Sequence, residues 1–155
     1  MFMGENRDYG TLAEKKFISM LNFYNIPYEY LNGEIDFTIY NIPIDVKSTL
    51  LSHKFTDRKS NTQKYKIGRF DITARQRNKN CYLALFVRND DNFLFLGITK
   101  IDETTHRYIS IHKLRELKVY TLKAFIRKIR SEGIENQKRF SEPLRGITKW
   151  NIILW

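Results

Sequence analysis

The sequence predicts an α/β (α+β) fold, in which an amphipathic helix precedes a series of short strands. Apolar residues recur every three or four positions between Gly10 and Tyr24, which is the period of a helix. Residues 33–47 alternate apolar and polar side chains along both strands of a predicted hairpin, and apolar runs at 82–87 and 93–98 flank a polar turn. The 155 residues, 1–155, are long enough for a single domain with a proper core.

The first element is the helix from about Gly10 to Tyr24. Thr11 is its predicted N-cap, and Glu14 three residues later would complete a capping box. Glu14 also lies beside the apolar stripe of Phe17 and Leu21, so it would point towards the edge of the core. The two roles for Glu14 are compatible, and both stay open at this point.

A short strand at 28–31 and a hairpin at 33–47 follow the helix. Folding the hairpin at Tyr40-Asn41 places three apolar residues on each strand opposite one another, which gives one wholly apolar face. The paired residues on that face are Ile35 with Val46, Phe37 with Ile44, and Ile39 with Ile42.

The other face of the hairpin carries charge. The same register puts Asp36 directly opposite Asp45, with Lys47 two residues further on. Like charges in that position destabilise a ladder, so something must compensate the two carboxylates. One interpretation is a divalent cation such as Mg²⁺, which takes oxygen ligands from one or two carboxylates. The alternative is a solvated face on which Lys47 screens both carboxylates.

Residues 50–68 are predicted to form a polar loop with little periodicity. Its five basic residues suit contact with DNA, although a mobile solvated loop explains the composition too; they are Lys54, Arg58, Lys59, Lys64 and Lys66. A short helix is expected at 69–80, with its exposed side including Arg75, Gln76, Arg77 and Lys79.

Beyond the two apolar strands the pattern predicts short helices at 110–117 and 122–130. The terminal segment Trp150–Trp155 is apolar enough to pack as an edge strand or in a subunit contact. The single cysteine, Cys81, begins an apolar run and is expected to be a buried structural thiol in a reducing compartment.

Positive charge is concentrated in two blocks. Residues 54–80 contain nine Lys or Arg against two Asp or Glu, and residues 105–155 contain twelve against four. Such clustering is typical of proteins that follow a phosphate backbone. No apolar run is long enough to span a membrane, no signal peptide is recognised, and no glycine-rich phosphate loop indicates a nucleotide cofactor. We therefore expect a cytoplasmic, nucleoid-associated protein with nucleic acid as its partner and no membrane.

The order helix, three strands, helix, strand resembles the αβββαβ core of the PD-(D/E)xK nuclease superfamily. The resemblance covers about residues 10–98 and is carried by Glu14, by Gly33-Glu34-Ile35-Asp36 and by Ile44-Asp45-Val46-Lys47-Ser48-Thr49. Two departures are Ile35 in place of proline and Asp45 where glutamate is commoner. The resemblance implies a restriction-endonuclease-like fold, with a mixed central sheet flanked by helices and a basic C-terminal extension at about 99–155.

The resemblance also implies roles for single residues. Asp36 would be the main ligand of one or two Mg²⁺ ions, and Asp45 would be the second. Lys47 would orient or help deprotonate the attacking water and stabilise charge on the phosphate. Glu14 would hold an outer-shell water. Gln76 is the candidate for a helix glutamine that reaches the site in some members; the alternative is a residue of the helix surface.

The expected activity is site-specific, metal-dependent hydrolysis of phosphodiester bonds in double-stranded DNA, as in intron-encoded homing endonucleases. A Holliday-junction resolvase or restriction endonuclease of the same fold is the alternative, and a non-catalytic DNA-binding protein is the rival from another class. Cutting both strands requires two sites, so a homodimer or higher homo-oligomer is expected. The residues expected to contact DNA are Lys54, Arg58, Lys59, Lys64, Lys66, Arg69, Arg75, Arg77 and Lys79.

Overall fold

The structure, a computed structural model, describes residues 9–31, 33 and 35–140, and within them it has a mixed central sheet. The strand order is β1-β2-β3-β7-β8-β10, and every neighbouring pair is antiparallel except β3 with β7. The predicted α+β class is confirmed. The strands are β1 (Glu29–Tyr30), β2 (Phe37–Ile39), β3 (Ile42–Leu50), β7 (Tyr82–Asn89), β8 (Asn92–Lys100) and β10 (Val119–Tyr120).

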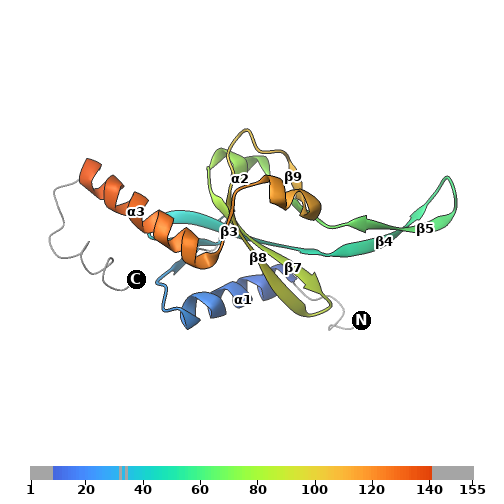
Figure 1. The fold of residues 1–155 in the computed structure, drawn as a ribbon, viewed down its shortest axis with the longest axis horizontal. Helices are drawn as coiled ribbons and strands as arrows, with labels where there is room; N and C mark the ends of the chain where they lie inside the picture. The colour runs from blue at the N-terminus through green and yellow to red at the C-terminus, as the bar shows by residue number, and fades with distance from the viewer. Residues whose placement is uncertain (1–8, 32, 34, 141–155) are drawn as a thin grey trace.

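Helices cover one face of this sheet, and smaller elements cover the other (Figure 1). On the first face lie α1 (Tyr9–Phe23) and α3 (Leu122–Phe140). On the second face lie α2 (Ala74–Asn78), η2 (Ile111–Glu116) and a small sheet of β6 (Arg69–Asp71) with β9 (Tyr108–Ser110). Because β3 and β7 are parallel, the chain between them must cross over the sheet, and α2 lies on that crossover.

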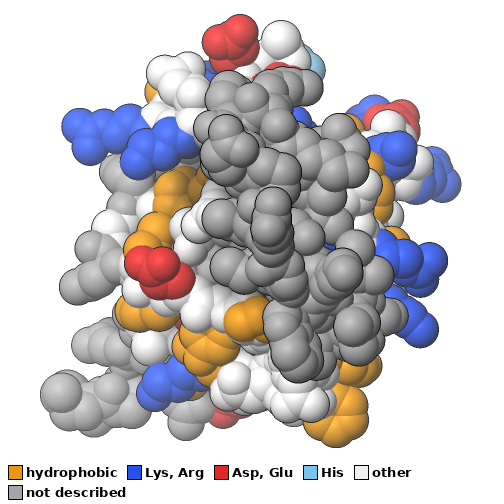
Figure 2. Space-filling view, turned by 90° about the vertical axis from the view of Figure 1, so that its left-hand side faces the viewer, with side chains coloured by type: hydrophobic (Ala, Val, Ile, Leu, Met, Phe, Trp, Pro, Cys, Tyr) orange, Lys and Arg blue, Asp and Glu red, His pale blue; other side chains and the backbone are white. Residues whose placement is uncertain are grey.

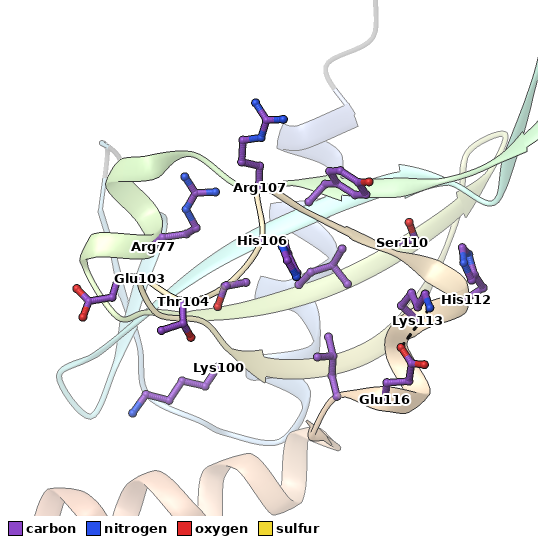
Figure 3. A pocket seen from close by; sticks show the side chains of 14 residues that line it. Arg77, Lys100, Glu103, Thr104, His106, Arg107, Ser110, His112, Lys113 and Glu116 are labelled. Atoms are coloured by element: carbon purple, nitrogen blue, oxygen red, sulfur yellow. Dashed lines mark ion pairs between the residues drawn. The ribbon is translucent and has the colours of Figure 1, made fainter.

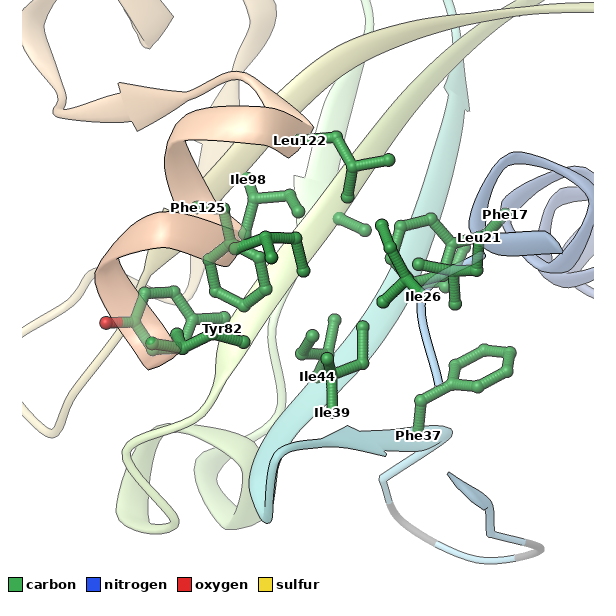
Figure 4. Close-up of a cluster of buried hydrophobic side chains, with 14 of the residues drawn as sticks. Phe17, Leu21, Ile26, Phe37, Ile39, Ile44, Tyr82, Ile98, Leu122 and Phe125 are labelled. Atoms are coloured by element: carbon green, nitrogen blue, oxygen red, sulfur yellow. The ribbon is translucent and has the colours of Figure 1, made fainter. Parts of the chain in front are cut away.

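The core between the sheet and the two long helices is rich in aromatic side chains (Figure 4). Phe17 of α1 is fully buried and makes an edge contact with Phe37 of β2 at 5.6 Å between ring centres. Tyr82 of β7 and Phe125 of α3 make a similar contact at 4.9 Å. Strand β7 is buried on both faces, as expected of a central strand flanked by a parallel neighbour.

Alternate residues of β7 supply the second core. Leu83 and Leu85 point to the face opposite Tyr82 and pack with Phe70, Ile72 and Ile109, among others. The sequence placed Ile35 on the face of Phe37 and Ile39, and this is wrong: Ile35 belongs to the second core. The pairing of β2 with β3 starts at Phe37, so the alternation of the ladder does not extend back to Ile35.

Three further expectations need correction. The predicted loop at 50–68 is instead an antiparallel hairpin of β4 (Ser52–Asp57) and β5 (Thr62–Ile67). The predicted helix at 69–80 is replaced by β6 and by the shorter α2, because its first residues pair with β9. Helix α1 already begins at Tyr9, so Thr11 lies within the first turn instead of at the N-cap.

The expectations for the later helices and for Cys81 are confirmed, whereas two others lie outside the described residues. Helical segments at 111–116 and 122–140 match the expected ones, the first as a 3₁₀ helix and the second longer than predicted. Cys81 is buried, as expected. Trp150–Trp155 and Glu34 lie outside the described residues. None of the helices described is sufficiently long and apolar to cross a membrane.

Candidate metal-binding and catalytic site

The site begins where β2 and β3 separate. Their backbone pairing ends at Phe37 and Ile44, and the side chain of Asp36 then takes over: its Oδ2 accepts a hydrogen bond from the Val46 backbone N–H at 2.8 Å. A carboxylate therefore occupies the position where a neighbouring strand would offer a carbonyl oxygen. The half-buried Asp36 is fixed against the edge of β3 by this bond.

Asp45 lies on β3, on the face of the sheet that α2 covers. It is 4% exposed, and its Oδ2 accepts a hydrogen bond from Gln76 Nε2 at 2.7 Å. The ammonium group of Lys47, two residues along the same face, lies 3.5 Å from the same oxygen. Asp45, Lys47 and Gln76 are thus brought together in one partly buried cluster, with Asp36 beside it.

The start of α2 fixes the orientation of Gln76. Thr73 caps the helix by accepting from the Gln76 backbone N–H at 3.1 Å, and Gln76 Oε1 accepts from the Thr73 backbone N–H at 3.2 Å. Because the amide oxygen is used in this capping box, the amide nitrogen is the atom left to donate to Asp45.

The placement of Gln76 differs from the exposed position that the sequence predicted, since only 4% of the residue is accessible. The pattern Thr73-Ala74-Arg75-Gln76 is a capping-box signature, so a helix beginning at Ala74 could have been read from it. The contact with Asp45, 31 residues earlier in the chain, depends on tertiary packing.

The pKa values of both carboxyl groups are raised, mainly by burial, and each group also affects the other. The pKa of Asp36 is raised to about 7, mainly by burial and also by the nearby charge of Asp45, against the opposing effects of the Val46 N–H and of Lys47. Burial also raises the pKa of Asp45, while its hydrogen bond with Asp36 and the nearby Lys47 act in the opposite direction. The pair therefore holds a proton more readily than isolated aspartates do, which is a feature that functional sites often have.

Glu14 lies on the side of α1 that faces β1. Tyr30 Oη donates a hydrogen bond to Glu14 Oε1 at 3.1 Å. The pKa of Tyr30 is raised first by this bond with Glu14 and to a smaller extent by the charge of Asp36, so both carboxylates lie near the same phenol. Glu14 is therefore at the margin of the site.

An open cleft of about 500 Å³ runs along β3, and Lys47 of the cluster lines it. It is lined by Val46 to Leu50, by Tyr9 and Gly10 at the start of α1, and by Arg88 at the end of β7. The Arg88 guanidinium stacks 3.4 Å above the centre of the Tyr9 ring. Sequence reasoning missed Arg88, because its place beside Leu50 comes from the parallel pairing of β3 with β7.

The residues expected to contact DNA lie in three regions, namely the β4–β5 hairpin, α2 and β6. Five of them, at positions 54, 58, 59, 64 and 66, are exposed on the β4–β5 hairpin and its turn. Arg75, Arg77 and Lys79 lie on or just after α2. Arg69 of β6 is paired with Asp71 at 3.3 Å and stacks on Tyr108.

Arg77 also borders a larger cleft of about 1020 Å³ between β8, β9 and η2 (Figure 3). Lys100, Arg107 and Lys113 line it together with acidic side chains, and Lys113 is paired with Glu116 at 3.6 Å. Basic side chains are not confined to this region, since the face at the α3 end carries Lys and Arg on both of its margins (Figure 2).

The side chains present fit a hard divalent cation. Asp36 and Asp45 offer carboxylate oxygens only, and Mg²⁺ is commonly held by one or two carboxylates together with water and substrate phosphate. Two adjacent carboxyl groups, one buried and one half-buried, whose pKa values are raised are the groups that a cation would compensate. No cluster of three or more His, Cys, Asp and Glu side chains suited to a metal is found within 9–31, 33 and 35–140.

Comparison with protein-family models, with curated proteins and with solved structures gives no match for this chain.

Proposed function

We propose that this chain is a divalent-metal-dependent endonuclease that hydrolyses phosphodiester bonds of double-stranded DNA. The observation that carries the proposal is the convergence of Asp36, Asp45 and Lys47 at the edge of β3, with Gln76 hydrogen-bonded to Asp45. Two carboxylates and a lysine in one cluster, beside an open cleft, suit the hydrolysis of a phosphate ester.

Each residue has a role that follows from its contacts. Asp36 and Asp45 would hold the cation, which when bound polarises a phosphate oxygen and lowers the pKa of a water. Lys47, 3.5 Å from Asp45, is positioned to hold the attacking water or to stabilise charge on the phosphate. Gln76 keeps Asp45 in place, since its amide is fixed by the helix cap. Glu14 would bind an outer water from the margin.

The finer expectation is site-specific cleavage of the homing type, with a resolvase or restriction activity as the alternative. The basic hairpin of β4 and β5 supports a long duplex target, because it extends well away from the site (Figure 1). Cutting both strands needs two copies of the site, so the proposal includes a homodimer or higher homo-oligomer.

A non-catalytic DNA-binding protein is the second candidate, and a specific observation favours it. Asp36 already accepts a hydrogen bond from the backbone of β3, and Asp45 already has Gln76 and Lys47 as partners. In this second candidate the carboxylates only stabilise the fold, while the basic surfaces bind DNA.

Cleavage assays distinguish the two candidates. Purified protein is incubated with supercoiled plasmid, linear genomic DNA and a four-way junction, each with Mg²⁺ and with EDTA. The variants Asp36→Asn and Lys47→Ala are compared with Asp90→Asn and Lys16→Ala, which make the same chemical changes at exposed positions away from the cluster. Wild type and both control variants are expected to give discrete duplex products in Mg²⁺. Asp36→Asn, Lys47→Ala and all samples in EDTA are expected to give none.

The outcomes separate the classes of protein. Paired nicks confined to the junction would identify a resolvase. Undiminished cleavage by Asp36→Asn would refute the site assignment. Binding of DNA without cleavage of any substrate, by wild type and variants alike, would favour the non-catalytic candidate.

A further inference from the structure

The β4–β5 hairpin, residues 52–67, forms an arm that projects from the body of the protein (Figure 1). All six side chains of β5 are exposed, and the exposed side chains of the arm include the aromatic rings of Phe55 and Tyr65. A two-stranded ribbon without a core of its own is only marginally stable in water. The arm therefore exposes apolar area, and it makes few contacts with the rest of the described chain.

The root and the tip of the arm are nevertheless held in defined positions. At the root, Gly68 donates to the Leu51 carbonyl at 3.0 Å and its own carbonyl accepts from the Ile111 N–H at 3.1 Å. At the tip, the Asp57 carbonyl accepts from the Asn61 N–H at 2.7 Å and its carboxylate pairs with Lys64 at 2.7 Å. These hydrogen bonds and this ion pair hold the turn Arg58-Lys59-Ser60-Asn61 in a defined position at the end of the arm.

The strand register decides what each side of the arm offers. Lys54 is directly opposite Tyr65, and Phe55 is directly opposite Lys64. Successive pairs lie on opposite faces of a ribbon, so one face carries Tyr65 beside Lys54 and the other carries Phe55 beside Lys64, with Lys66 on the same face as Lys64. Neither face is a continuous apolar surface that would lie on a membrane or pack against an apolar groove.

Charge identifies the occupant that this surface suits. The arm and its turn contain five basic residues against the single acid Asp57. Two such arms would repel each other, which disfavours a second copy of the chain as the partner. A polyanion is the complementary partner, and the major groove of B-DNA, about 12 Å wide, admits a two-stranded ribbon.

We propose that the arm enters the major groove of duplex DNA tip first, with Arg58 and Asn61 at the base edges and Lys54 and Lys66 on the flanking phosphates. The proposal rests on the duplex substrate proposed above and adds the groove and the residues that read it. Arginine and asparagine are the side chains that recognise guanine and adenine in this groove. The lysines on the two faces of the ribbon meet the phosphates on the two walls of the groove.

The distance from the arm to the site agrees with this arrangement. Arg58 at the tip follows Lys47 by eleven residues along nearly continuous β-structure. Eleven residues of extended chain span about 36 Å, which is close to one helical turn of B-DNA. A duplex read by the tip would therefore meet the cluster of Asp36, Asp45 and Lys47 about one turn away from the bases that Arg58 contacts.

Binding is measured with the full chain in EDTA, so that cleavage plays no part. The probe is a pool of duplexes with a randomised centre, from which bound molecules are selected and sequenced. Lys54→Ala with Lys66→Ala should lower the affinity for all duplexes about tenfold and reduce the salt slope by about 2. Lys15→Ala with Lys16→Ala on α1, an equal change of exposed charge, is the matched control and should change both much less.

Arg58→Ala and Asn61→Ala should each relax the selected DNA sequence at particular positions. Because asparagine carries no charge, Asn61→Ala should have the same salt dependence of binding as wild type. Dimethyl sulfate should be blocked at guanine N7, in the major groove, and should still react at adenine N3, in the minor groove. Protection at adenine N3 instead, equal losses in the α1 control, or absence of duplex binding would each overturn the proposal. Binding that follows these expectations without cleavage in Mg²⁺ would refute only the nuclease proposal.

Discussion

Replacing Asp36 with asparagine should stabilise the metal-free protein at and above neutral pH. Burial and Asp45 raise the pKa of Asp36 to about 7, from an ordinary value of 3.8. A carboxyl group whose pKa is higher in the folded state contributes stability that is fully present below about pH 4 and is lost as pH rises through about 7. Asparagine resembles the protonated form, since its amide can accept from the Val46 N–H and donate to Asp45.

The size of the effect follows from the same shift. The difference between 3.8 and about 7 corresponds to about 4 kcal/mol at 1.36 kcal/mol per pH unit. Asp36 is only half-buried, so solvent screening reduces this to about 1–2 kcal/mol. For a chain of this length the midpoint of thermal unfolding should rise by about 2–8 °C at pH 8, and by much less at pH 5.

The assay is thermal unfolding of wild type, Asp36→Asn and the exposed control Asp90→Asn in EDTA between pH 4 and 8. The readout is the difference between variant and wild type, because other groups also titrate in this range. Added Mg²⁺ at pH 8 should raise the midpoint of wild type and leave that of Asp36→Asn nearly unchanged. Equal pH profiles for wild type and Asp36→Asn, or a lower midpoint for the variant at pH 8, would refute the reasoning.

Other substitutions test the surroundings of the site. Gln76→Ala removes the amide that donates to the buried Asp45 and should destabilise the fold by about 1–3 kcal/mol in urea unfolding, whereas an unchanged midpoint would show that the bond contributes little. Gly68→Ala places a Cβ 1.8 Å from the Leu50 carbonyl oxygen, so the arm root must shift and limited proteolysis should cut the arm faster than in wild type. Burial raises the pKa of the Cys81 thiol to about 11, so a thiol reagent should label it only after denaturation, and rapid labelling of the native protein would contradict its buried position.

Apolar periodicity was sufficient to predict the helices and strands with the strongest patterns. The helix of Phe17 and Leu21 and the strand of Leu83 and Leu85 follow from apolar spacing, because the repeat of each element is fixed by backbone geometry. The pairing of Phe37 with Ile44 also followed from pattern, since a one-residue slip would turn every apolar side chain to the other face. The same register put Asp36 directly opposite Asp45, and this part is wrong, because the ladder ends at Phe37 and Ile44 and the Asp36 side chain instead accepts from the Val46 N–H next to Asp45.

The surroundings of Asp36 and Asp45 depend on tertiary packing, which the pattern of the hairpin does not contain. The face of Asp45 reads as charged in the hairpin alone, yet α2 covers it and buries Gln76 against it, because the parallel pairing of β3 and β7 carries the crossover across that face. The same pairing brings Arg88 to the cleft. The arm was wrongly predicted to be a loop. All of β5 is exposed, so the arm lacks the alternation of apolar and polar residues from which a strand is predicted.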